Sequence, residues 1–175
     1  MRGTIAVAAL CVALGACVEQ GADLTATAAL PHSPIERREN MSVSAATVAL
    51  VSIEGAPDSV AAAFRQALAR EFSTRDVIAV EPRKAHYLVR GYLSASPTTD
   101  GVDLEYVWDV YGANRARVAR LNDVISLKGS GEAWSQVGDP ALATVAAKSA
   151  EDLAALLSNM PEAKPVAAQA LSYAE

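Results

Sequence analysis

Acidic side chains alternate with apolar ones between residues 103 and 111. Asp103, Glu105 and Asp109 occupy alternate positions, and the residues between these positions are apolar. Because successive side chains of a strand point to opposite faces, this alternation predicts a half-buried strand with all three carboxylates on its polar face. Carboxylates within ~7 Å of one another can act as a general acid and base, as in glycoside hydrolases. We favour the alternative, in which they form the solvated face of an acidic protein.

None of the other candidate residues completes a catalytic or metal-binding pattern. The two histidines, His32 and His86, are too few for a His-rich metal site, and His86 has no nucleophile beside it. The serines lack a Gly-x-Ser-x-Gly motif. In the glycine-rich segment 128–131 the lysine precedes the glycines, unlike in a phosphate-binding loop. The sequence therefore predicts that the protein is not an enzyme and uses no metal or cofactor.

Aromatic residues offer a second kind of binding surface. Trp134 lies in a predicted loop and is therefore the aromatic residue least constrained by a strand. Together with the three carboxylates it makes up the candidate partner-binding residues. Tyr106 and Trp108 occupy the apolar positions of the alternating strand, and we expect them to pack against the helices. An aromatic platform for a glycan is the alternative.

A basic cluster follows the acidic strand. Arg115, Arg117 and Arg120 come directly after a predicted turn at 112–114. In a hairpin these arginines face the acidic strand, where each cross-strand pair of opposite charges contributes ~0.2–1 kcal/mol. We favour this pairing over a site for an anionic ligand, which is the alternative.

The elements that position these residues follow from the hydrophobic pattern. Strands are predicted at 47–53, 77–80, 86–95, 103–111 and 117–127. Two amphipathic helices are predicted, one after Pro57 and one for which Asp139 is the N-cap and Pro140 the first residue. This order predicts an α+β fold, a two-layer sandwich in which a mixed, mostly antiparallel sheet of about five strands carries two helices on one face.

Composition narrows the class of protein. A chain of 175 residues has room for one domain and some spare length. Its net charge of −5 leaves no basic excess with which to bind nucleic acid. Two cysteines, Cys11 and Cys17, are too few for a disulfide scaffold.

The first 16 residues have the pattern of a signal peptide. Arg2 precedes an apolar run that is too short to span a bilayer, which requires ~20 residues. The segment 14–17, Leu-Gly-Ala-Cys, resembles the lipobox of bacterial lipoproteins. This resemblance implies that Cys17 is acylated and becomes the N-terminus, and two or more acyl chains hold a protein firmly in a membrane. A plain cleaved signal with a spare cysteine is the alternative.

The residue after this cysteine indicates which membrane is involved. Val18 occupies the position that is an aspartate in those members of the lipoprotein family that stay in the inner membrane. For a Gram-negative source, the resemblance therefore implies an anchor in the outer membrane, with the domain facing the periplasm. The membrane is thus one expected partner, through the N-terminal lipid.

The remaining chain divides into three predicted parts. Residues 17–45, with Pro31 and Pro34, form a flexible tether, and residues 46–158 form the periplasmic domain. Residues 159–175, rich in alanine and proline, form a weakly ordered tail.

Short motifs add a resemblance that covers about residues 45–158. The runs 91–95, Gly-Tyr-Leu-Ser-Ala, and 106–111, Tyr-Val-Trp-Asp-Val-Tyr, are followed by Trp134 and a closing amphipathic helix. Together with the element order they resemble a group of bacterial lipoproteins. The topology of that group is similar to the N-terminal domain of TolB and to the curli-secretion and penicillin-binding-protein-activator lipoproteins. This resemblance implies envelope assembly or adaptor proteins, and it carries over no functional residue.

Two functions fit these observations. The first is a lipid-anchored periplasmic adaptor or assembly component that binds another envelope protein, or copies of itself, through an uncovered sheet face or an open strand edge. The alternative is an envelope protein that binds a glycan or a lipid.

Overall fold

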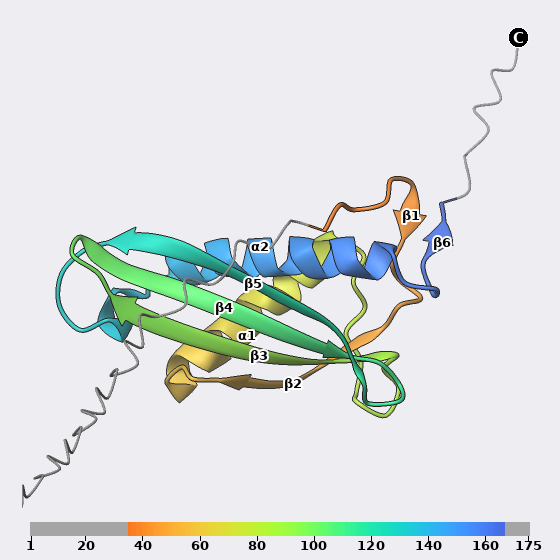
Figure 1. Ribbon diagram of the computed structural model, residues 1–175, viewed down its shortest axis with the longest axis horizontal. Coiled ribbons are helices and arrows are strands. Elements are labelled where there is room, and N and C mark those ends of the chain that lie inside the picture. Colours follow the sequence, from red (N-terminus) through yellow and green to blue (C-terminus); the bar gives the residue numbers. More distant parts are fainter. Residues whose placement is uncertain (1–34, 167–175) are drawn as a thin grey trace, which may run out of the picture. The chain divides into compact units, whose positions relative to one another are not determined.

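The computed structural model describes residues 35–166, which form an α+β sandwich of two layers (Figure 1). Its elements are β1 (Met41–Ser42), β2 (Val48–Glu54), α1 (Asp58–Thr74), β3 (Tyr87–Pro97), β4 (Gly101–Tyr111), β5 (Arg117–Lys128), the 3-10 helix η1 (Trp134–Gln136), α2 (Asp139–Ser158) and β6 (Lys164–Pro165). The main sheet has the order β2-β3-β4-β5, in which β2 and β3 are parallel and the other pairs antiparallel. Both helices lie on one face of this sheet, as the sequence predicts.

The fifth predicted strand, at 77–80, is reduced to a single bridge between Val48 and Ala79. The backbone N–H of Val48 donates to the carbonyl of Ile78 (3.0 Å), and that of Val80 donates to the carbonyl of Val48 (2.8 Å). The chain then turns away at residues 81–84, where Pro82 has no N–H to offer to a ladder. The main sheet therefore contains four strands.

Both predicted helices are present, with one correction at a helix start. In α1 the buried side chains are Phe64, Ala67, Leu68 and Phe72, which lie three or four residues apart. Helix α2 has Gly138 as its N-cap, whereas the sequence predicts Asp139 in that role. The Asp139 side chain makes no cap hydrogen bond and instead places a negative charge in the first turn, where the helix dipole favours it.

The core between the two layers is centred on Trp108. Its ring stacks on Phe64 of α1, with ring centroids 6.0 Å apart and an interplanar angle of 18°. On the neighbouring strand, Gly91 pairs with Trp108. A Cβ atom at position 91 would lie only 2.8 Å from Cη2 of the indole, so the ring occupies the space that a side chain would need. This confirms the expectation that Trp108 and Tyr106, both fully buried, pack against the helices.

Residues outside the predicted range 46–158 also contribute to the domain. Strands β1 and β6 pair with each other, and Val43 is fully buried. The backbone N–H of Arg38 donates to Oγ of Ser158 (2.9 Å), which joins the segment before β1 to the end of α2. The predicted signal peptide, Cys17 and Val18 lie outside the described residues, as do residues 167–175. Neither α1 nor α2 combines the length and apolarity needed to cross a membrane.

Candidate functional site

One face of the main sheet carries no helix from the described residues 35–166, and we call it the open face. It consists of the alternate side chains of β2 to β5 that point away from the core. Residues that lie opposite each other on neighbouring strands form rows that run across the sheet. The central row contains Glu54, Tyr92, Val107 and Asn122. The rows toward one end contain the carboxylates of Asp103 and Glu105, and the rows toward the other end contain a group of arginines.

Asp109 is the most constrained residue of this face, because it is only 2% exposed on a side without helices. Arg120, its cross-strand neighbour on β5, donates from Nε to Oδ1 (2.7 Å) and from Nη2 to Oδ2 (2.6 Å). Arg117 donates from Nη1 to Oδ1 (3.3 Å). The hydrogen bonds from Arg120 and the two positive charges hold the pKa of Asp109 below its usual value, although burial alone would raise it.

This pairing confirms the predicted hairpin contact for Arg117 and Arg120. The two guanidinium groups are about half exposed, so they cover Asp109 and present their outer edges to solvent. Arg115 differs, because it lies in the turn with a φ of 61° that places it in the left-handed region. Asp109 also differs from the solvated stripe that the alternation suggests, because arginines shield it from water.

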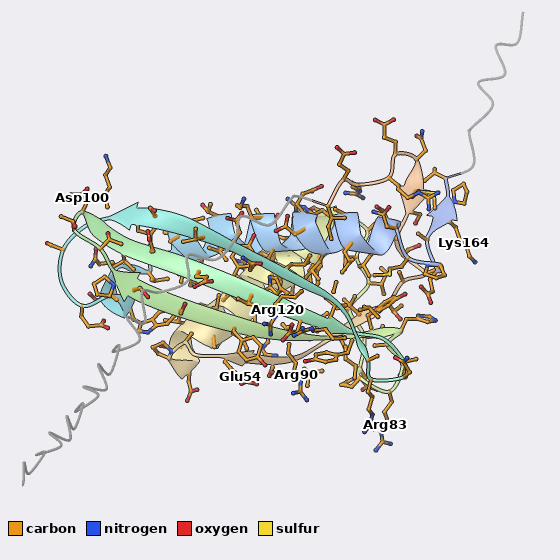
Figure 2. The ribbon with its side chains drawn as sticks, viewed as in Figure 1. Glu54, Arg83, Arg90, Asp100, Arg120 and Lys164 are labelled. Carbon is orange, nitrogen blue, oxygen red and sulfur yellow. The ribbon has the colours of Figure 1, made fainter. Side chains whose placement is uncertain are left out.

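A third arginine, which does not belong to the cluster predicted at 115–120, lies on the strand at the other side of Asp109. Arg90 on β3 is the cross-strand partner of Asp109, and its guanidinium lies over the ring of Tyr111, 5.7 Å from the centroid. Figure 2 shows Arg90 and Arg120 at this part of the sheet. Alternation in the segment 86–95 could have placed Arg90 on the polar face, but only the strand register brings it to Asp109. Asp109 thus has two arginines bonded to it, Arg117 and Arg120, and a third, Arg90, opposite it in register, and we call these four residues the basic end.

The opposite half of the open face is acidic. Asp103 accepts a hydrogen bond from Oγ of Ser126 (2.6 Å), and Glu105 pairs in register with Ser94 and Val124. We call Asp103 and Glu105 the acidic end. Neither of them has a basic residue directly opposite on β3 or β5. Both are half buried, so their carboxylates remain accessible to a partner.

The other predicted site residues lie elsewhere. Trp134, in η1, packs against the hydrophobic core, whereas the three carboxylates point out of the opposite face. A ring nitrogen of His86, Nδ1, forms a hydrogen bond with Oγ1 of Thr47 (2.9 Å), and His86 is an exposed residue directly before β3. Within residues 35–166, no group of three or more histidine, cysteine or acidic side chains is arranged to hold a metal ion.

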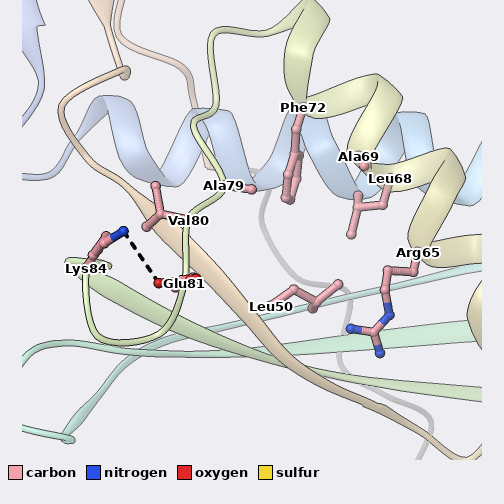
Figure 3. A pocket seen from close by; sticks show the side chains of 9 residues that line it. All are labelled: Leu50, Arg65, Leu68, Ala69, Phe72, Ala79, Val80, Glu81 and Lys84. Atoms are coloured by element: carbon pink, nitrogen blue, oxygen red, sulfur yellow. Dashed lines mark ion pairs between the residues drawn. The ribbon is translucent and has the colours of Figure 1, made fainter.

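A separate apolar groove lies between α1 and the segment that precedes β3 (Figure 3). Its volume is about 590 Å³. It is lined by Leu50, Arg65, Leu68, Ala69, Phe72, Ala79, Val80, Glu81 and Lys84. Lys84 pairs with Glu81 across 3.5 Å, and both side chains are largely exposed at the rim.

Comparisons with known proteins return structures but no sequence relatives. No family model matches the chain, and no curated protein matches it. A PelC dodecamer from Paraburkholderia phytofirmans is 15% identical, with a TM-score of 0.44, and the match covers 67% of this chain and 91% of that one. A minor lipoprotein from Acinetobacter baumannii is 11% identical, with a TM-score of 0.40, covering 64% of this chain and 94% of that one. Function therefore has to be inferred from the side chains of this protein.

Proposed function

We propose that this chain is a lipid-anchored adaptor or assembly component of the bacterial envelope, and that its domain binds a protein partner through the open face. The anchor is the acylated Cys17, in the outer membrane, and the domain faces the periplasm. The segment between Cys17 and the domain acts as the tether.

The observation that carries this proposal is the composition of the open face. Arg90 is exposed, and Tyr92 and Tyr111 are half exposed, on a side of the sheet that no described helix covers. Arginine and tyrosine are enriched in protein interfaces, where they supply large contact areas and directed hydrogen bonds. The two oppositely charged ends would fix the orientation of a partner, because complementary potentials favour one register.

The same face supports a binding function rather than a catalytic one. A catalytic acid needs a proton near neutral pH, whereas the pKa of Asp109 is lowered by its hydrogen bonds from Arg120 and by the arginine charges. Its oxygens accept hydrogen bonds from Arg117 and Arg120, which hold the carboxylate in place. Asp109 therefore acts as a structural centre for the arginines that a partner would contact.

Crosslinking in cells, followed by capture of the full-length lipoprotein from solubilised envelope, tests this proposal. The Asp103→Lys/Glu105→Lys variant should lose the partner, because it reverses the charge of the acidic end. A matched control is Glu39→Lys, at an exposed residue of the turn before β1. Equal capture of the partner by the wild type, the double variant and the control would remove the open face from the proposal. Separately, Cys17→Ser should move the protein from the membrane to the soluble fraction.

The groove beside α1 supports the alternative, binding of a glycan or lipid. Its volume of about 590 Å³ is in the range of ligand pockets, and Arg65 and Lys84 lie at its apolar lining. Lipopolysaccharide and peptidoglycan fragments can be titrated into the protein while tryptophan fluorescence is followed, because Phe64, which stacks on Trp108, belongs to the same helix as Leu68 and Phe72. A saturable change with either ligand supports this alternative, and no change with any of them contradicts it.

A further inference from the structure

The charges on the open face are arranged in opposite halves. Taking the central row as the dividing line, the basic end has three arginines and one carboxylate, Asp109. The acidic end has two carboxylates, Asp103 and Glu105. The basic end therefore carries a net positive charge. The other half keeps a net negative charge, although Lys128 lies at its edge, opposite Gly101. The row between the two halves has the uncharged residues Tyr92 and Val107 in its middle.

We propose that the partner on the open face is a second copy of this chain, packed face to face about a two-fold axis. The axis lies between the two sheets, at right angles to the strands, and passes over Tyr92 and Val107. This inference rests on the proposed function, since it names the occupant of the same face.

The choice of axis follows from the register. Glu105 and Asp109 lie on β4, one row to either side of Val107. Rotation about the proposed axis exchanges these rows, so that Glu105 of one copy lies opposite Asp109 of the other. Because Asp109 is only 2% exposed and already paired, Glu105 meets the arginines on either side of it, Arg90 and Arg120. Because the rotation is two-fold, the same contact forms twice.

The competing arrangement is electrostatically unfavourable. An axis along the strands would leave each row opposite itself, so that the two acidic ends meet each other and the two basic ends meet each other. Like charges that oppose each other across an interface weaken association. Glu54 also lies on the proposed axis and would therefore face Glu54 of the other copy. It stands at the end of the edge strand β2, however, where the twist of two aligned sheets moves their corners apart.

The open face has the size and composition for such an interface. Four strands with a spacing of ~4.8 Å and a length of ~34 Å cover about 650 Å² per copy, or about 1,300 Å² in total. That area is at the small end of standard protein interfaces, ~1,200–2,000 Å², so we expect a reversible dimer. Val124, which is 50% exposed, and the half-buried Val107 add apolar area near the centre. Anchoring both copies in one membrane would raise their effective concentration.

Charge reversal in separate copies tests the inference, with full-length lipoprotein in mild detergent and sedimentation equilibrium as the measurement. Glu105→Arg alone and Arg90→Glu alone should each weaken self-association at least about tenfold, because two repulsive contacts replace two attractive ones. An equimolar mixture of the two variants should associate more tightly than either variant alone, since the arginine introduced at position 105 of one copy then faces the glutamate introduced at position 90 of the other, and Glu105 of that other copy faces the unchanged Arg90 and Arg120. Arg70→Glu, at an exposed position of α1, is the matched control and should associate as the wild type does.

Thermal unfolding followed by circular dichroism shows whether each variant is folded, so that loss of association can be assigned to the interface. A monomeric wild type at all concentrations, or a mixture that stays monomeric, would overturn the inference. If Glu105→Arg then still weakens capture of a different envelope protein, the proposed adaptor function stands without the dimer. If Glu105→Arg changes neither self-association nor capture, both proposals for this face fail.

Discussion

Trp108 and Asp109 are neighbours in β4 that are both shielded from water, but for opposite reasons. Trp108 is fully buried beneath α1, where it stacks on Phe64, a residue far away in the chain. Asp109 is 2% exposed on the open face, where Arg117 and Arg120 from the same hairpin cover it. Burial in this sheet can therefore come from a second layer of structure or from local charge pairing.

This difference determines what each residue contributes. Burial of Trp108 removes a large apolar surface from water, so its loss leaves a cavity in the core. Asp109 contributes through hydrogen bonds and charge, and its arginine partners can return to water if it is removed. We therefore expect substitutions on the covered face to affect stability most, and substitutions on the open face to affect binding most.

The largest effect is expected for Trp108→Ala. Removing the ring from a closed core should lower the free energy of unfolding by about 3–5 kcal/mol, measured by urea denaturation. Val107→Ala, at the adjacent position on the open face, is the control and should cost much less. Equal losses for the two variants would contradict the distinction between the faces.

Gly91→Ala should be the next most destabilising substitution. The new Cβ would meet the indole of Trp108, and such overpacking costs about 1–3 kcal/mol, even though alanine is otherwise the better strand residue. Combining Gly91→Ala with Trp108→Leu should cost less than the sum of the two separate losses, because leucine vacates part of the space. If the two losses in the free energy of unfolding simply added, the contact with Trp108 would not be the reason for glycine at position 91.

Asp109→Asn should cost about 1–2 kcal/mol at neutral pH, because a charged acceptor is lost but the half-exposed arginines can be hydrated. The pKa of Asp109 is lowered in the folded state, chiefly by the Arg120 hydrogen bonds, so its stabilising contribution is complete above the unfolded pKa of ~3.9. It is lost as the pH falls through the lower, folded value. The stability difference between wild type and variant should therefore be constant near neutral pH and shrink below about pH 4. If the stability difference instead grew on acidification, the pKa of Asp109 would be raised in the folded state and not lowered.

The smallest effect on stability is expected for Glu105→Gln. This residue pairs in register with Ser94 and Val124, so the free energy of unfolding should change by less than about 0.5 kcal/mol. Partner capture or self-association should nevertheless weaken, because the acidic end loses half of its charge. A large change in stability would instead give Glu105 a structural role.

Part of the candidate site is predictable from the alternating pattern alone. That pattern places Asp103, Glu105 and Asp109 on one polar face, and the turn at 112–114 brings Arg120 opposite Asp109 and Arg117 within reach of it. It does not reveal that Asp109 is enclosed, because that depends on side-chain geometry across the ladder. Arg90 escapes prediction for a related reason, since its approach to Asp109 depends on the register between β3 and β4.

Local periodicity is enough to predict the class of fold: strands by alternation, helices by apolar residues three or four apart, and two layers by the order of these elements. It does not show that the segment at 77–80 forms one bridge rather than a strand, or that Gly91 leaves room for Trp108. Nor does it show that β1 and β6, from the two ends of the described chain, pair with each other. Periodicity depends on near neighbours along the chain, whereas register and packing depend on residues that meet only after folding.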